Sequence, residues 1–125
     1  PVIPGLNDHE MERILDSAKA AGASSASYIL LRLPLEVSPL FRDWLLRHYP
    51  DRYRHVMSLV RSMRGGKDYD ADFSKRMKGQ GPYAWQLARR FEITTKKLGL
   101  DKRGAPLRTD LFTPPMGMGV QLNLL

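Results

Sequence analysis

The feature that most constrains this chain is an apolar strand–helix–strand pattern in residues 1–34. The run at residues 27–31 is continuously apolar, which is typical of a strand covered on both faces, as in a parallel sheet. Val2 and Ile3 indicate the end of another buried strand, and an apolar stripe at helical spacing lies between the two. Because two strands are too few to be stable alone, the unit needs the rest of a sheet to lie on, and the pattern does not show where that sheet comes from.

We therefore predict an α/β fragment with a βαβ unit at residues 1–34. A mainly helical extension at 35–100 follows, in which Ser38 and Pro39 open a helix and Pro82 opens another that closes at Gly99. Residues 65–81 carry many charges and little periodicity, which predicts a long charged loop. The proline- and glycine-rich residues 101–125 are predicted to form a flexible tail.

Composition excludes several kinds of chemistry. The chain has no cysteine, so disulfides, thiol catalysis and cysteine-ligated metals are excluded within it. Its three histidines lack metal-binding spacing, so we predict no metal site. There is no long apolar run and no secretory signal, so we expect a cytoplasmic protein without membrane contact. The missing starting Met suggests a cut inside a longer protein.

A net charge of +7 and a pI near 10 favour contact with polyanions, without sequence specificity. The alternative is a basic surface that simply faces solvent. Tyr69, Phe73 and Tyr83 lie among the basic residues and could stack on bases, although the plainer interpretation is that Tyr69 and Phe73 hold the loop against the domain. The candidate phosphate contacts are Arg61, Arg64, Lys67, Lys75, Arg76 and Lys78.

Polar side chains follow each predicted strand, where open α/β folds bind ligands. Gly5 would let a backbone approach a flat ligand closely. Asn7 and Asp8 stand at a helix N-terminus, in a capping-box-like pattern with Glu10, and Arg32 could pair with a carboxylate or phosphate. The alternative is structural: the two residues cap the helix, and Arg32 is a solvated charge.

The stretches PVIPGLNDHE, YILLRLP, FRDWLLRHYPDR and SMRGGKDYDADFSKRMKGQGPYA cover most of the chain. Together they resemble the C-terminal half of radical S-adenosylmethionine (SAM) proteins related to spore photoproduct lyase, a branch often labelled DNA repair photolyase. The resemblance implies an incomplete parallel (β/α)6 barrel, of which residues 1–34 would be the last βαβ unit. It also implies a lyase-like parent enzyme that holds a [4Fe-4S] cluster through a CxxxCxxC loop in its N-terminal half.

The same resemblance implies which residues of this chain would lie beside SAM in the parent, called the SAM-side residues below. Against the family's GxIxGxxE-like segment, Ile3, Gly5 and Asp8 are in register, while Pro1 and Asp8 depart from the pattern's first Gly and its Glu. The implied SAM-side residues are Ile3, Gly5, Asn7, Asp8 and Arg32. SAM and the cluster would belong to the parent, whose N-terminal half is the expected partner. Because cluster binding needs thiolates, we expect no catalysis from this chain alone.

The end of the chain carries a second resemblance. Residues 121–125, QLNLL, resemble the bacterial sliding-clamp-binding pentapeptide QLxLF, with Leu125 in place of Phe. The candidate clamp contacts are Gln121, Leu122, Leu124 and Leu125. The alternative is an apolar tail that packs on its own domain.

Two rival functions therefore stay open besides an enzyme segment. One is a non-catalytic basic helical module that binds nucleic acid or the clamp, and the other is a structural domain that covers one end of the parent. Alone, the fragment is expected to dimerise through an exposed strand edge or to rearrange.

Overall fold

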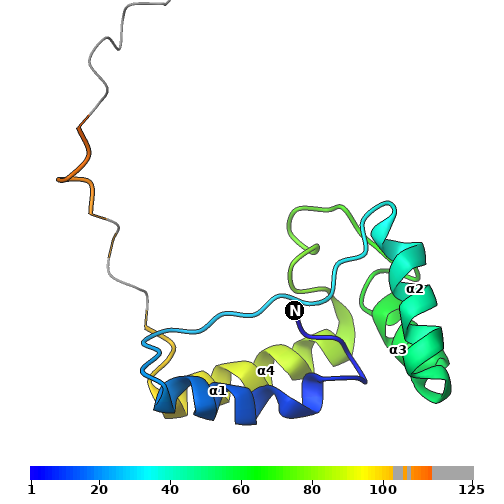
Figure 1. The fold of residues 1–125 in the computed structure, drawn as a ribbon, viewed down its shortest axis with the longest axis horizontal. Coiled ribbons are helices and arrows are strands. Elements are labelled where there is room, and N and C mark those ends of the chain that lie inside the picture. Colours follow the sequence, from blue (N-terminus) through cyan, green and yellow to red (C-terminus); the bar gives the residue numbers. More distant parts are fainter. Residues whose placement is uncertain (103–105, 107, 114–125) are drawn as a thin grey trace, which may run out of the picture.

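The computed structural model describes residues 1–102, 106 and 108–113, and helices make up its regular structure (Figure 1). Pro82 stands in the first turn of the last helix, and Gly99 ends it with a left-handed φ of +65°. In chain order the elements are the 3-10 turn η1 (Asp8–Glu10) and the helices α1 (Met11–Ala20), α2 (Val37–His48), α3 (Pro50–Ser62) and α4 (Gly81–Leu98).

The predicted βαβ unit is wrong. Among the described residues, sheet-like pairing is limited to one parallel bridge between Val2 and Leu30. In this bridge Val2 N donates to Ile29 O at 2.8 Å, and Leu31 N donates to Val2 O at 2.9 Å. Residues 23–34, called the extended segment below, form no strand. The described chain is therefore all-helical and not an α/β fragment with part of a barrel.

The reason lies in the hydrogen-bond partners of the extended segment. Leu30 N donates to the loop carbonyl of Met77 at 2.8 Å, where a sheet would offer another strand. Leu31 O accepts a hydrogen bond from Nη2 of the buried Arg64 at 3.0 Å. A buried backbone must be hydrogen-bonded, but a loop and a side chain meet that requirement as well as a strand does. An apolar run indicates burial, and it does not identify the partner.

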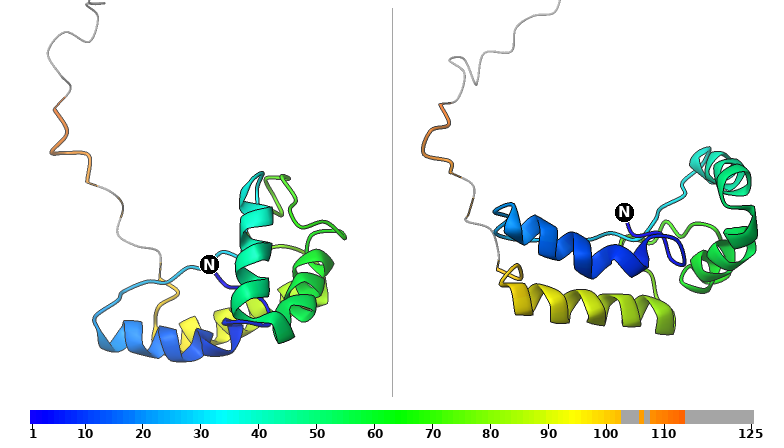
Figure 2. Two further views of the ribbon diagram at one scale, coloured as in Figure 1. Left: turned by 45° about the vertical axis from the view of Figure 1, so that its right-hand side comes forward. Right: turned by 60° about the horizontal axis from the view of Figure 1, so that its bottom comes forward.

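The helices form two pairs joined by the extended segment (Figure 1). At one end α1 and α4 lie side by side and run in the same direction, as both views of Figure 2 show. At the other end α2 and α3 pack as an antiparallel hairpin, because only Tyr49 separates them. The extended segment crosses from one pair to the other.

The core consists of three small clusters, and the extended segment contributes to each of them. Leu33 joins the cluster of α2 and α3, Leu30 joins the cluster at the start of α4, and Ala23 and Ala26 pack against the third. Their other buried members are Leu45, Val56, Met57 and Val60 in the first, Met63, Ala84 and Leu87 in the second, and Met11, Leu15 and Leu100 in the third.

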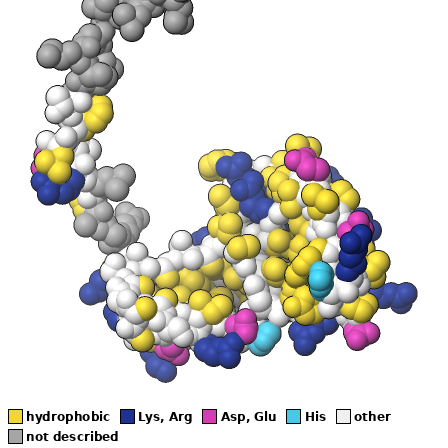
Figure 3. All heavy atoms as spheres, in the orientation of Figure 1, with side chains coloured by type: hydrophobic (Ala, Val, Ile, Leu, Met, Phe, Trp, Pro, Cys, Tyr) yellow, Lys and Arg dark blue, Asp and Glu magenta, His cyan; other side chains and the backbone are white. Residues whose placement is uncertain are grey.

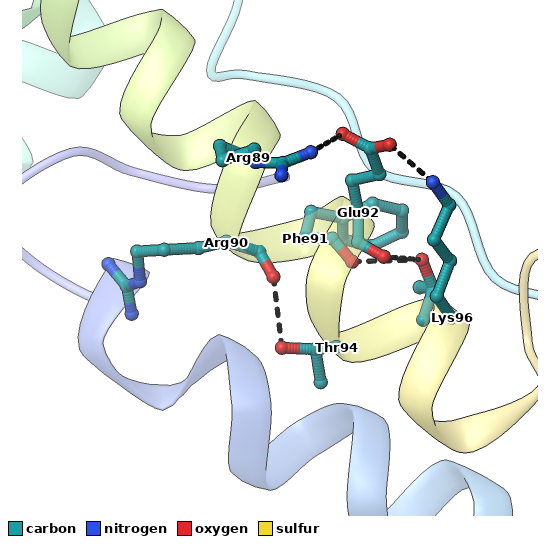
Figure 4. A network of polar contacts seen from close by, with 7 residues as sticks. Arg89, Arg90, Phe91, Glu92, Thr94 and Lys96 are labelled. Carbon is teal, nitrogen blue, oxygen red and sulfur yellow. Dashed lines mark hydrogen bonds and ion pairs between the residues drawn. The ribbon is translucent and has the colours of Figure 1, made fainter.

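The two sides of α4 differ in their polar contacts (Figure 4). On the exposed side Glu92 accepts from Arg89 at 2.9 Å and from Lys96 at 2.7 Å. Exposed ion pairs of this kind contribute little to stability. Arg90 extends away from this trio toward α1, where it makes the contacts described below.

Gly79 provides a test of how closely the loop between α3 and α4 packs on the core. Its φ is +69°, and an added Cβ would lie 3.0 Å from Leu30 Cδ1 and 3.2 Å from Met63 O. Gly99 has a similar φ of +65° but nothing within 4 Å. We expect Gly79→Ala to lower the free energy of unfolding by about 1–3 kcal/mol more than Gly99→Ala, because only Gly79 also suffers overpacking. Urea denaturation of both variants measures the difference, and equal losses would contradict the contact.

Candidate functional site

The SAM-side residues predicted before α1 lie in residues 3–8, called the N-terminal turn below. Asn7 directs its side chain back along the chain: Oδ1 accepts from Ile3 N at 2.7 Å, and Nδ2 donates to Pro1 O at 3.3 Å. Ile3 N and Pro1 O point away from the extended segment, because Val2, which lies between them, directs its own N–H and C=O toward that segment. Asn7 therefore shapes the turn, and the predicted capping hydrogen bond to the helix start is not formed.

Asp8 is the buried acid of the N-terminal turn, with 6% of its surface exposed. Its Oδ1 accepts from Gly5 N at 3.0 Å, and its Oδ2 accepts from the hydroxyl of Tyr83 on α4. Burial, helped by the hydrogen bond to Asp8, raises the pKa of Tyr83 to about 12. The phenol therefore stays protonated at neutral pH and ties the turn to α4.

Arg90 makes a second tie between the N-terminal region and α4. Its Nη2 donates to Asp8 O at 3.0 Å, and its Nε and Nη2 bind the two oxygens of Glu12 at 2.8 Å each. The hydrogen bond from Arg90 holds the pKa of Glu12 below its ordinary value. Sequence reasoning missed Glu12 and Arg90 and gave Tyr83 a different role, because 75 to 82 residues separate the partners.

These contacts leave few free groups for a cofactor. The side-chain polar atoms of Asn7 and both carboxylate oxygens of Asp8 are used within the chain. Gly5 packs against α3, where an added Cβ would lie 2.9 Å from His55 Cδ2, and Ile3 packs on the cluster of α2 and α3. These side chains are thus engaged within the chain, and the SAM-side role stays a prediction. The chain has no cysteine for an iron–sulfur cluster.

Arg32, the remaining SAM-side residue, is engaged elsewhere. Its Nη2 donates to Tyr69 Oη at 3.3 Å, and its Nη1 lies 3.9 Å from Met77 Sδ. Within the described residues no hydrogen bond joins Arg32 to Asn7 or Asp8. The structure therefore places Arg32 with the charged loop.

Half of the predicted nucleic-acid contacts are engaged within the chain. Arg61 Nε donates to Asp68 Oδ1 at 2.7 Å, and Lys75 Nζ lies 3.7 Å from Asp72 Oδ2. The hydrogen bond from Arg61 helps to lower the pKa of Asp68, although burial opposes the shift. Arg64 is 2% exposed, and its guanidinium donates to backbone carbonyls inside the molecule. None of the three is a free phosphate contact.

The other half lies in the loop, where two residues are exposed and Arg76 is half-buried. Lys67 and Lys78 are exposed, and the guanidinium of Arg76 lies 4.3 Å from the ring centroid of Phe73. Phe73 is 80% exposed, so the interpretation that it pins the loop is wrong. Tyr69 is half-buried and packs against the cluster of α2 and α3, as the plainer interpretation expected.

An open hollow of about 450 Å³ lies between α1, the extended segment and α4. Figure 3 shows apolar side chains in this region of the surface. Ile14 and Ile29 line it and remain 55% and 41% exposed. We call it the apolar hollow; its apolar lining comes chiefly from Val2, Met11, Ile14, Tyr28, Ile29 and Phe91.

The predicted clamp contacts, Gln121, Leu122, Leu124 and Leu125, lie outside the described residues and stay a prediction. Within the described part, no group of three or more His, Cys, Asp or Glu side chains is arranged to hold a metal ion. None of the described helices combines the length and apolarity needed to cross a membrane. Comparisons with known protein families, curated proteins and solved structures found no match.

Tyr83 gives a pH-dependent prediction. Its folded pKa of about 12 lies above the ordinary value of 10.0, so the neutral phenol is favoured by folding. The resulting stability is complete below pH 10 and is lost as the pH rises from 10 toward 12. We expect Tyr83→Phe to lose less stability than the unmodified chain over this range, as measured by thermal unfolding. Tyr49→Phe, which removes an exposed phenol, is the control, and identical pH profiles for all three proteins would contradict the Tyr83–Asp8 pair.

Proposed function

We propose that this chain is the C-terminal segment of a cytoplasmic radical SAM enzyme of the spore photoproduct lyase-like branch. We further propose that it docks on the rest of that enzyme through the apolar hollow. The stretches PVIPGLNDHE, YILLRLP and SMRGGKDYDADFSKRMKGQGPYA support the family. The observation that carries the docking role is the open hollow with its exposed apolar side chains.

The hollow suits a protein partner because of what lines it. Ile14 on α1 and Ile29 on the extended segment are both partly exposed beside Met11 and Phe91. A concentration of apolar surface on one face is typical of a region that meets another protein surface. Burying a fully exposed Ile contributes about 1.5–3 kcal/mol, so covering the exposed half of Ile14 or Ile29 contributes roughly half of that.

In this proposal the chain supplies architecture and the parent supplies the chemistry. A cysteine-bound cluster outside these residues would supply reductive cleavage of SAM. Asn7 lines the hollow, and the contacts of Asp8 with Tyr83 and Arg90 fix the turn that carries it. The docking face is thereby held in one shape before the partner arrives, which lowers the entropic cost of association. A role in DNA repair is the expectation that comes with the resemblance.

The test uses the full-length gene product that contains this chain. We expect a CxxxCxxC motif upstream and, after anaerobic purification, stoichiometric iron and sulfide together with cleavage of SAM to 5′-deoxyadenosine. In that protein Ile14→Asp should lower the thermal midpoint and speed proteolytic release of the C-terminal segment, because it places a charge in the docking face. The 125-residue chain alone should hold no iron.

Ile93→Asp is the matched control for the docking face. Ile93 is 53% exposed on α4, nearly the same as Ile14, but it does not line the hollow. We expect it to leave both readouts close to those of the unmodified protein. A reading frame without CxxxCxxC would contradict the family, and equal effects of the two Asp variants would contradict the docking face.

A second candidate function, nucleic-acid binding, is favoured by the exposed ring of Phe73 and its half-buried neighbour Arg76, which lie between the exposed Lys67 and Lys78. An exposed ring with a cation beside it is a surface on which bases stack.

We expect the chain to bind fluorescently labelled single-stranded DNA with an affinity that falls steeply with salt. Phe73→Ala should weaken binding by about 1–3 kcal/mol, the contribution of one stacked base. Phe112→Ala removes another largely exposed ring, 69% exposed, and is the control. Fluorescence anisotropy measures both, and salt-independent binding or equal losses would contradict this function.

A further inference from the structure

Three arginines in or beside the charged loop, Arg32, Arg64 and Arg76, make no ion pair within the described residues. Within the described part of the chain, none of them has a carboxylate oxygen within 4.0 Å. Arg61 and Arg90, which are also partly buried, each make a hydrogen-bonded ion pair. The positive charge beside the loop is therefore not neutralised by any direct ion pair among the described residues.

Arg64 supplies the deepest of these charges. It is 2% exposed, and its Nη1 and Nη2 donate to the backbone carbonyls of Lys75 at 2.7 Å and Leu31 at 3.0 Å. Carbonyl oxygens satisfy its donors but do not cancel its charge. Burial lowers the pKa of Arg64, and the nearby charge of Arg32 lowers it further, while Asp70 and Tyr69 act in the opposite direction. Arg64 therefore feels both the attraction of Asp70 and the weaker repulsion of Arg32.

Arg32 has donors that the chain leaves unused. Its Nε is buried without a hydrogen-bond partner, and its Nη groups meet only a phenol oxygen at 3.3 Å and the thioether of Met77 at 3.9 Å. A thioether is a weak acceptor, and a guanidinium has five N–H donors in a planar fork. The Tyr69 hydroxyl accepts from Arg32 and donates to no described acceptor, so its proton is also free.

We propose that Arg32 and the Tyr69 hydroxyl form a binding site for a phosphate-class oxyanion, with the charge of Arg64 behind them. The two Nη groups of one guanidinium match two oxygens of a phosphate, while the buried Nε reports on the state of the group. Two nearby cationic groups favour a phosphate over a singly charged carboxylate. Met77, which is 38% exposed, is the side chain that the anion would displace from Arg32. This site does not depend on either function proposed above.

The experiment follows the arginine Nε–H signals of the full 125-residue chain in ¹H–¹⁵N spectra. The Arg32 signal is assigned by its loss in Arg32→Lys. Inorganic phosphate is titrated at constant ionic strength in one arm, and a single-stranded oligonucleotide in the other. We expect a saturable shift of the Arg32 signal, centred on that residue. A shift by phosphate itself assigns the site to free or terminal phosphate, and a shift by the oligonucleotide alone assigns it to a phosphodiester.

Arg32→Lys keeps the charge but removes the fork, so it should weaken binding about tenfold in isothermal titration, the size of one charge-assisted hydrogen bond. Arg54→Lys is the control, because Arg54 is exposed on α3 and makes no ion pair within the described residues. It should leave the affinity unchanged. Equal weakening in the two variants, or no saturable shift with either ligand, would overturn the site.

Discussion

The hydrogen bonding of the extended segment is the constraint on which the rest of the structure depends. This segment crosses the middle of the molecule, so its backbone groups need partners away from water. Val2, the Met77 carbonyl and the Arg64 guanidinium provide them from three separate regions of the chain. A fourth contact, from Ala26 N to Leu100 O at 2.9 Å, joins the segment to the cluster of α1 and Leu100. The segment contributes side chains to all three clusters and so links them.

The same arrangement explains why polar residues carry so much of the architecture. With small clusters and no sheet among the described residues, the joints between helices rely on buried or half-buried pairs. Asp8 and Arg90 join the N-terminal turn to α4, while Asp68 joins α2, α3 and the loop through Ser38 and Arg61. Hydrogen-bonded pairs of this kind fix how the elements are oriented. They also occupy polar side chains that, in the sequence alone, resemble ligand-binding residues.

Periodicity and end signals were sufficient to predict α1 and α4, because α1 has an apolar stripe and α4 a proline start and a glycine end. The expected start of α2 at Ser38 and Pro39 was slightly wrong, since α2 begins at Val37 without a side-chain cap. The partner of residues 27–31 was not predictable, since an apolar run has the same appearance beside a strand or beside a loop. The candidate nucleic-acid contacts were likewise predicted only in part. Lys67 and Lys78 are exposed as a basic surface requires, whereas Arg64 is buried, and charge alone does not distinguish the two positions. Asp8 and Tyr83 are too far apart in sequence for any local pattern to join them.

The long separation between the N-terminal turn and its partners also orders events in time. Asp8 and Glu12 are made 75 to 82 positions before their partners Tyr83 and Arg90. Contacts across such intervals close slowly, because the intervening chain must first give up its freedom. During synthesis the turn and α1 therefore wait until α4 has left the ribosome. The contacts between α2 and α3 are local. This helical hairpin can therefore form before the N-terminal turn and α1 reach their partners on α4.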